Sequence, residues 1–352
     1  MIPVLTVPRA VAAVRSGGLV VVPTETVYGL AANALDQTAV AKIFRAKGRP
    51  QINPIICHLP SADAVFRYGM YSRTADALSR FWPGPLTVLL AHENRIPSIV
   101  TAGSPYAGFR VPDHPVMLEF LRACEVPIAA PSANRSGRRS PTTLAMVRAD
   151  ADDAYSELVA GALDGGPCRV GLESTVVAVV SEDPPTIRIL RPGGVTRETL
   201  IDAGLQVIGD ANNPAQENNR STTEAPLLHA PGQLLKHYGP GVPLLLMERA
   251  TSGSEKFTVQ IRAALARFNA GGAPVWWLGF AGRPAPVPCD FVLDLSVRGD
   301  LAEAAQNLFV FFERIRNSGP AVILAETLPQ QELGVALNDR LTRAAAEWIP
   351  FV

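Results

Sequence analysis

Three cations stand within five positions, in Arg45-Ala46-Lys47-Gly48-Arg49, and Asn53 follows shortly after them. Cations this close together suit a polyanion. An ammonium binds a phosphate as a point charge, and a guanidinium can hold two oxygens of a phosphate or carbonate. A solvated basic helix end, favoured by the helix dipole, would give the same pattern. Gly48 and Pro50 interrupt the run and favour a shaped anion pocket.

A second polar segment, Pro131-Ser132-Ala133-Asn134-Arg135-Ser136-Gly137, follows an expected strand, and Ser140 and Thr142 then lead into an expected helix. A strand, a polar loop and a helix N-terminus together form a site for an anion or a ribose. Ser132 and Asn134 could equally cap the turn with their own side chains. The sequence contains neither a Walker loop nor a dinucleotide fingerprint, so neither motif explains a nucleotide here.

Further polar side chains stand at the ends of expected apolar strands. The run Pro23 to Gly29 carries hydroxyls and a carboxylate directly after a strand, which is where open α/β sheets place ligand-binding groups. His58, Arg110 and Arg191 also stand at strand ends, and Ser174 stands at a strand entrance, where it could bind a small ligand. Each residue alone is weak evidence for a binding site, because a lone His at a strand end is more often structural and a Ser in a strand is commonly a surface residue. Together they predict an anion pocket, since the acids form neither a metal cage nor a catalytic carboxylate pair.

The elements that must position these residues can be read from hydrophobic periodicity. The expected strands of the N-terminal half are 19–22, 55–58, 86–91, 127–130, 173–180 and 186–190. The expected helices there are 8–15, 38–45, 72–81, 115–123, 142–148 and 196–203. Their mixed order predicts a twisted mixed sheet with helices, closer to α+β than to a strictly doubly wound α/β fold.

The 352 residues suggest two domains at roughly 150 residues each. Residues 209–221 are almost free of apolar side chains and mark a connector. The expected division is therefore a first domain at 1–208, a linker at 209–241 and a second domain at 242–352. In the last, strands at 243–247, 275–278 and 321–325 alternate with helices at 255–268, 301–316 and 336–348, which predicts a small Rossmann-like parallel α/β domain.

Composition excludes several classes of protein. Lys+Arg and Asp+Glu both number 32, so a broad basic face for nucleic acid or anionic lipid is not expected. The four cysteines lie too far apart for CxxC spacing and are expected to be reduced thiols. No apolar run approaches the roughly 20 residues needed to cross a bilayer, and no secretory signal pattern is apparent, so a cytoplasmic protein without membrane contact is expected.

Joined together, these motifs resemble the YrdC-type L-threonylcarbamoyladenylate synthases in their long two-domain form. The resemblance is carried by Pro23-Thr24-Glu25-Thr26-Val27-Tyr28-Gly29-Leu30, Lys47-Gly48-Arg49-Pro50 with Asn53-Pro54, Ser132-Ala133-Asn134 with Ser136-Gly137, Glu173-Ser174-Thr175-Val176, Leu190-Arg191-Pro192-Gly193, Pro231-Gly232 to Lys236-His237-Tyr238-Gly239-Pro240, and Asn338-Asp339-Arg340-Leu341. It departs at Tyr106, where the family commonly has Thr.

The resemblance implies a synthase domain built as a twisted sheet around a basic concavity. It implies that L-threonine, bicarbonate or CO2, and ATP react to give threonylcarbamoyl-AMP and pyrophosphate, with Mg2+ accompanying ATP. A separate, transiently associated transferase would then carry the threonylcarbamoyl group to tRNA. Stable binding of tRNA by this chain itself is not expected.

By the same resemblance, Lys47 and Arg49 act on the triphosphate and bicarbonate. ATP binding falls to Lys47, Arg49, Asn53, Ser132, Asn134, Ser140, Thr142 and Arg191, with His237 and Tyr238 bringing the linker over the entrance. Threonine binding falls to Thr26, Tyr28, His58, Arg110 and Ser174. No protein side chain is assigned to the metal. We further expect Lys47 and Arg49 to be solvent-side cations whose removal leaves the fold intact.

Two alternatives stay open at this stage. The concavity could grip double-stranded RNA through Arg45, Lys47, Arg49, Arg135, Arg138 and Arg139, although the sequence lacks an aromatic stacking platform. A carbamoyl transferase of the hydrogenase-maturation type shares the synthase domain, but this chain has no Cys-rich zinc motif. The second domain implies no nucleotide of its own and is expected to anchor the linker.

Overall fold

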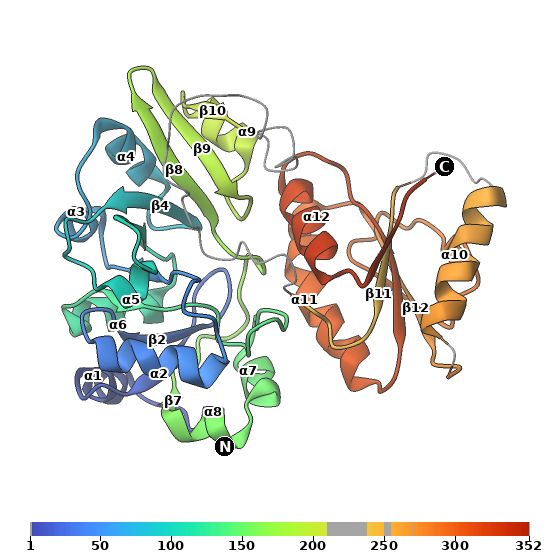
Figure 1. The fold of residues 1–352 in the computed structure, drawn as a ribbon, viewed down its shortest axis with the longest axis horizontal. Coiled ribbons are helices and arrows are strands. Elements are labelled where there is room, and N and C mark those ends of the chain that lie inside the picture. The colour runs from blue at the N-terminus through green and yellow to red at the C-terminus, as the bar shows by residue number, and fades with distance from the viewer. Residues whose placement is uncertain (1, 210–237, 250–254, 270, 352) are drawn as a thin grey trace. The chain divides into compact units, whose positions relative to one another are not determined.

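The protein is described by a computed structural model over residues 2–209, 238–249, 255–269 and 271–351 (Figure 1). The chain divides into two compact units. One comprises Met1–Ser136 with Ser140–Gln233, and the other Gly137–Arg139 with Leu234–Val352. The loop at 137–139 therefore groups with the C-terminal part of the chain.

A ten-stranded mixed sheet forms the centre of the first unit. Its order is β10-β9-β8-β4-β5-β3-β6-β2-β1-β7. The strands are β1 (Leu19–Val22), β2 (Gly29–Asn33), β3 (Ile56–His58), β4 (Leu86–Ala91), β5 (Tyr106–Arg110), β6 (Ile128–Ala129), β7 (Val159–Ala162), β8 (Thr175–Glu182), β9 (Pro185–Arg191) and β10 (Gln206–Ile208). Parallel and antiparallel pairings alternate irregularly, which confirms the expected mixed sheet.

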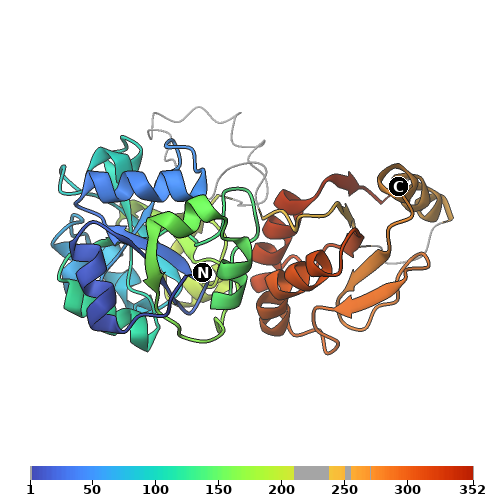
Figure 2. The same cartoon turned by 90° about the horizontal axis from the view of Figure 1, so that it is seen from below.

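Short helices surround this sheet (Figures 1 and 2). They are α1 (Val7–Arg15), α2 (Gln37–Lys47), α3 (Ala62–Phe66), α4 (Arg73–Leu78), the 3-10 helix η1 (Ser79–Phe81), α5 (Ser98–Thr101), α6 (Pro115–Cys124), α7 (Leu144–Asp150), α8 (Asp153–Leu158) and α9 (Arg197–Asp202). Helix α2 begins where the Asp36 carboxylate accepts hydrogen bonds from the amides of Thr38 and Ala39. It ends at Gly48, whose left-handed conformation (φ 61°) favours glycine.

The central strands have one face in the core. Cys57, Val88, Phe109 and Val177, on β3, β4, β5 and β8, belong to one buried apolar cluster. Because side chains alternate between the faces of a strand, the neighbouring residues on these strands point to the opposite face. That opposite face carries the polar residues described below.

A five-stranded parallel sheet forms the second unit, in the order β13-β12-β14-β11-β15. Its strands are β11 (Leu244–Met247), β12 (Val275–Gly279), β13 (Phe291–Asp294), β14 (Val322–Glu326) and β15 (Glu347–Ile349), and its helices are α10 (Glu255–Phe268), α11 (Leu301–Asn317) and α12 (Leu333–Ala344). Helices α11 and α12 lie on one face and α10 on the other (Figures 1 and 2). This arrangement confirms the expected Rossmann-like parallel domain.

The structure corrects the expected helix at 336–348. Helix α12 ends at Ala344, and Glu347–Ile349 forms β15, which pairs in parallel with β11. The alternating burial of a short edge strand was mistaken for helical spacing. Strands β2, β5, β7, β10 and β13 and helices α3, α5 and α8 were also not predicted, and several of them are short or rich in Gly and Ala.

Two further expectations can be examined in the described residues. All four cysteines are free thiols, three of them buried. Within the described ranges, no helix combines the length and apolar character that crossing a bilayer requires.

Candidate functional site

The end of helix α2 and the loop after β6 are joined by one side chain. The Lys47 ammonium donates hydrogen bonds to the carbonyl oxygens of Ser132, at 2.5 Å, and of Asn134. The Ser136 amide donates to the Lys47 carbonyl at 2.8 Å, and the Arg135 guanidinium donates to the Ala46 carbonyl at 2.6 Å. The two polar segments singled out in the sequence therefore form one structure.

Lys47 corrects an expectation about its surroundings. The residue is only 2% exposed, so it is not the solvent-side cation that was predicted. Burial lowers the pKa of Lys47 well below its usual value, and the positive charges of Arg49 and Arg135 lower it further. Removing this side chain should therefore affect the fold as well as any anion bound nearby.

Arg49 lies directly after the helix and is partly exposed. Its Nε donates to the carbonyl of Asn53 at 3.2 Å, and its Nη2 donates to the carbonyl of Pro54 at 2.9 Å. These bonds hold the turn that leads to β3. Asn53 itself is 4% exposed and lies in the same turn.

Five neighbouring strands place their residues in one row across the sheet. His58 on β3 is the register partner of Arg110 on β5. Continuing the antiparallel register of β4 and β5 places Thr87 opposite Arg110, and Thr87 pairs with Val176 on β8. Val176 in turn pairs with Arg191 on β9. Register partners share a face, so these side chains lie on the face opposite the core.

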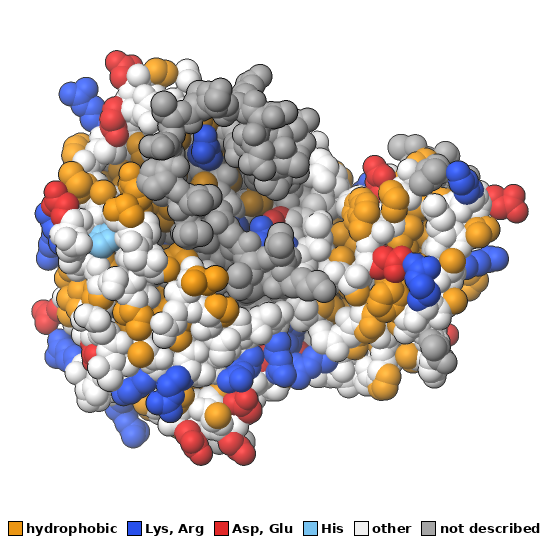
Figure 3. Space-filling model, in the orientation of Figure 1, with side chains coloured by type: hydrophobic (Ala, Val, Ile, Leu, Met, Phe, Trp, Pro, Cys, Tyr) orange, Lys and Arg blue, Asp and Glu red, His pale blue; other side chains and the backbone are white. Residues whose placement is uncertain are grey.

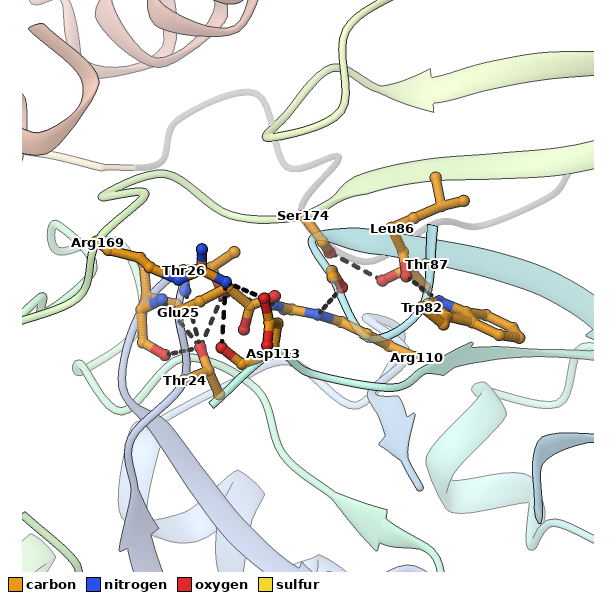
Figure 4. Close-up of polar contacts among 12 residues, drawn as sticks. Thr24, Glu25, Thr26, Trp82, Leu86, Thr87, Arg110, Asp113, Arg169 and Ser174 are labelled. Carbon is orange, nitrogen blue, oxygen red and sulfur yellow. Dashed lines mark hydrogen bonds and ion pairs between the residues drawn. The ribbon is translucent and has the colours of Figure 1, made fainter. Parts of the chain in front are cut away.

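The guanidinium of Arg110 is the centre of a buried polar cluster (Figure 4). Its Nη2 donates to the Thr26 hydroxyl at 2.9 Å and contacts the Glu25 carboxylate at 2.7 Å, and its Nε donates to the Gly84 carbonyl at 3.2 Å. Thr24 donates its one hydroxyl proton to the Val27 carbonyl at 2.6 Å. The Thr26 hydroxyl therefore donates to Thr24 Oγ1, 2.8 Å away, and accepts from Arg110.

Ser174 connects the next two strands. Its hydroxyl lies 2.8 Å from the Thr87 hydroxyl, and Arg191 donates to the Ser174 carbonyl at 2.8 Å and to its hydroxyl at 3.1 Å. Thr87 was not predicted as a site residue. The available signal was a polar residue inside the apolar strand at 86–91, on a position that alternates with core residues.

His58 is held as a neutral imidazole. It is 3% exposed, and burial, aided by the positive charge of Arg110, lowers its pKa to about 3. Its Nδ1 has no hydrogen-bond partner among the described residues. A neutral ring with one nitrogen unused is suited to donate to, or accept from, a bound polar group.

The loop 131–142 runs along the segment 23–29 and brings the two groups of residues together. Gly29 forms an isolated bridge with Ser132, the Ala133 amide donates to the Tyr28 carbonyl at 2.8 Å, and the Tyr28 amide donates to the Pro141 carbonyl at 2.9 Å. Further along, the Ser140 hydroxyl donates to the Glu173 carboxylate at 2.5 Å, next to Ser174.

The remaining predicted residues have other surroundings. Tyr28 is fully buried, and its hydroxyl bonds to Asp164, to the Gly165 amide and to the Gly166 carbonyl. The Thr142 hydroxyl faces the sulfur of Met146. Roles for both with substrate stay predictions.

The linker residues were expected to cover the site. Tyr238 groups with the second unit, where its ring stacks on Phe309 and lies 5.3 Å from the Arg340 guanidinium. His237 lies outside the described residues. The covering role of both therefore stays a prediction.

The basic groups of the site are local rather than part of a broad basic surface. On the face drawn in Figure 3, Lys and Arg side chains are interspersed with Asp and Glu. Of the cations that could have contacted RNA, Lys47 and Arg139 are buried, and Arg139 is ion-paired with Glu313. Among the described residues, no group of three or more His, Cys, Asp or Glu side chains is arranged to hold a metal ion.

Two family models match this chain. The Sua5–YciO–YrdC model, described as "Telomere recombination", matches residues 12–193, and a model described as "Threonylcarbamoyl-AMP synthase, C-terminal domain" matches residues 195–346. A threonylcarbamoyl-AMP synthase of Pyrococcus abyssi is 38% identical over 335 residues, which cover 94% of this chain and 92% of the relative. One from Bacillus subtilis is 35% identical, with 96% and 92% covered. The crystal structure of Pyrococcus abyssi Sua5 complexed with L-threonine matches with a TM-score of 0.80 and 34% identity, covering 98% and 96% of the two chains.

Proposed function

Because the chain belongs to the two-domain threonylcarbamoyl-AMP synthase family, we propose that it joins L-threonine, bicarbonate or CO2, and ATP into threonylcarbamoyl-AMP with release of pyrophosphate. It is then a nucleotidyltransferase of tRNA modification, whose product a separate tRNA threonylcarbamoyl transferase consumes. The observation that carries the proposal is the contact of Lys47 with the carbonyls of Ser132 and Asn134. It joins the two anion-binding motifs beside a second polar cluster around Arg110.

We assign nucleotide binding to the group of residues around Lys47. Lys47 and Arg49 neutralise the triphosphate and hold the bicarbonate, and Asn53, Ser132, Asn134, Ser140, Thr142 and Arg191 complete the ATP site. Arg191 donates to Ser174 and so lies beside the polar cluster around Arg110, which would place the nucleotide next to the amino acid. The family resemblance further predicts that His237 and Tyr238 keep water from the reacting groups.

We assign threonine binding to the polar cluster around Arg110. Arg110 faces the carboxylate of threonine, His58 and Ser174 contact its polar atoms, and Thr26 and Tyr28 complete the pocket. Tyr106, two positions from Gly108 and four from Arg110, occupies the same face of β5 and packs near Leu89 and Val176. Tyr106 thus places an aromatic ring on the face of β5 that carries Arg110, at a position where the family commonly has Thr.

The reaction needs no nucleophile from the protein. The threonine amine adds to CO2 to form a carbamate, and a carbamate oxygen attacks the α-phosphorus of ATP as pyrophosphate leaves. Every participant in the second step is anionic, so alignment and charge neutralisation supply most of the acceleration. Mg2+ would accompany ATP as MgATP and would help to neutralise the charge of the phosphates.

Release of pyrophosphate tests the proposal directly. Purified full-length protein is given ATP, L-threonine, bicarbonate and Mg2+, and each component is omitted in turn. Pyrophosphate should form only in the complete mixture. Release that does not depend on threonine would contradict the proposal, as would tight binding of duplex RNA, steeply salt-dependent, without measurable ATP affinity in calorimetry.

A further inference from the structure

A carboxylate that the proposed reaction does not use lies inside the Arg110 cluster. The Glu25 side chain is completely buried, that of Arg110 is 4% exposed, and the two are 2.7 Å apart. The backbone holds Glu25 in place, because the Val170 amide donates to its carbonyl at 2.8 Å and Thr24 organises the following turn. A carboxylate buried in this way is costly unless a fixed partner compensates its charge.

The pairing occupies one side of the guanidinium. Arg110 Nη2 donates to the Thr26 hydroxyl and lies 2.7 Å from a carboxylate oxygen of Glu25 as an ion pair, and Nε donates to the Gly84 carbonyl. Neither carboxylate oxygen of Glu25, both of them buried, has a hydrogen-bond partner among the described residues, and the hydrogen bonds of Arg110 there use Nε and Nη2 but not Nη1. Buried polar atoms left in this state often mark a place where a ligand or water completes the site. Arg110 is thus oriented with one edge available.

The charge of the pair decides what this edge accepts. An unpaired guanidinium holds a phosphate as readily as a carboxylate, since both offer two oxygens at matching spacing. Arg110 and Glu25 together have no net charge, so their attraction for a multiply charged phosphate is weak. The N–H donors on Nη1 remain able to bind the carboxylate of a zwitterion, which is itself neutral overall.

We propose that Glu25 is a positioning and specificity residue: it fixes the Arg110 guanidinium and cancels its charge, so that the pocket takes an amino acid and rejects the phosphates bound close by. This inference rests on the proposed function, because it assigns Arg110 to the amino-acid carboxylate. Glu25 was noticed in the sequence only as a carboxylate after a strand, and neither ATP nor threonine binding was assigned to it.

Glu25→Gln tests the inference in the full-length protein. The KM for threonine should rise at least about tenfold with a smaller change in kcat, because the guanidinium loses its charged partner. Inorganic phosphate should become a competitive inhibitor against threonine in this variant, whereas the native protein should show no such competition. Glu326→Gln is the matched control, since Glu326 is 3% exposed and paired with Arg283 at 2.8 Å in the second unit. It should change neither quantity.

Two outcomes would overturn the inference. An unchanged threonine KM in folded Glu25→Gln protein contradicts the positioning role, and a raised KM without phosphate competition contradicts the charge-based selectivity. If Glu25→Gln does not fold, Glu25→Asp is the second variant, because it keeps the negative charge and shortens the side chain by one methylene. The KM of this variant for threonine should rise severalfold. An unchanged KM would overturn the positioning role. Failure of the proposed function is recognised separately, as native protein that releases no pyrophosphate with threonine.

Discussion

Lys47→Met should destabilise the first unit and abolish turnover together. The ammonium satisfies two carbonyls, of Ser132 and Asn134, and lies 2% exposed. Leaving a buried carbonyl without a partner costs about 1–3 kcal/mol. Two such groups would cost about 2–6 kcal/mol, and relief from burying a charge, which the lowered pKa of Lys47 reveals, offsets part of this. We therefore expect a loss of about 2–4 kcal/mol in the free energy of unfolding.

Lys42→Met provides a matched control on the same helix. The Lys42 ammonium donates to one carbonyl, that of Gly17, at 2.6 Å, and the residue is only partly buried. Its loss should cost about 0.5–1.5 kcal/mol and leave turnover unchanged. Hydrogen-exchange mass spectrometry of full-length protein reports the local free energy of unfolding at peptides from α2 and from residues 132–136. Equal protection in the two variants would refute the reasoning, as would native protection of the loop in Lys47→Met.

Three further changes have defined outcomes. The pKa of His58 is about 3 in the folded protein, against the usual 6.5. As the pH falls from 6.5 towards 3, His58 takes up a proton in the unfolded chain but stays neutral in the folded protein. The free energy of unfolding therefore falls over this range. Between pH 6.5 and 5, urea unfolding should show native protein losing about 2 kcal/mol more than His58→Gln; parallel pH profiles would contradict this. Thr87→Val removes the 2.8 Å contact with the Ser174 hydroxyl and should raise the KM for threonine several-fold with little change in kcat. An unaltered KM would contradict a role of Thr87 in threonine binding. Asp36→Ala removes the N-cap of α2 and should lower stability by about 1 kcal/mol with normal turnover, which thermal unfolding can disprove.

Hydrophobic periodicity predicted most of the elements that position the site. The strand at 86–91 and the helix at 255–268 have the expected bounds, because each is a long and strongly patterned segment. β2, with the sequence Gly-Leu-Ala-Ala-Asn, was not predicted because its stability comes from pairing with β1 and β6 rather than from strand propensity. Tertiary pairing of this kind leaves no local signal.

The sequence indicated candidate site residues but not their surroundings. Motif spacing indicated that Lys47 and Arg49 bind an anion, a role that stays a prediction. It could not reveal that Lys47 is buried against the loop at 132–136, since that contact joins residues 85 and 87 positions apart. The role of Thr87 likewise depends on strand order, which places β4 between β5 and β8. Both facts come from the packing of distant segments.

We propose that cations and hydroxyls from distant strands form one site where an amino acid, a carbon source and a nucleotide react. Mass spectrometry of the reaction with 13C-labelled bicarbonate tests it most directly. We predict an adenylate whose mass equals threonine plus CO2 plus AMP less one water, increased by the single labelled carbon, and absent when threonine is omitted. An adenylate formed without the label, or no adenylate from folded protein with all substrates present, would contradict the account.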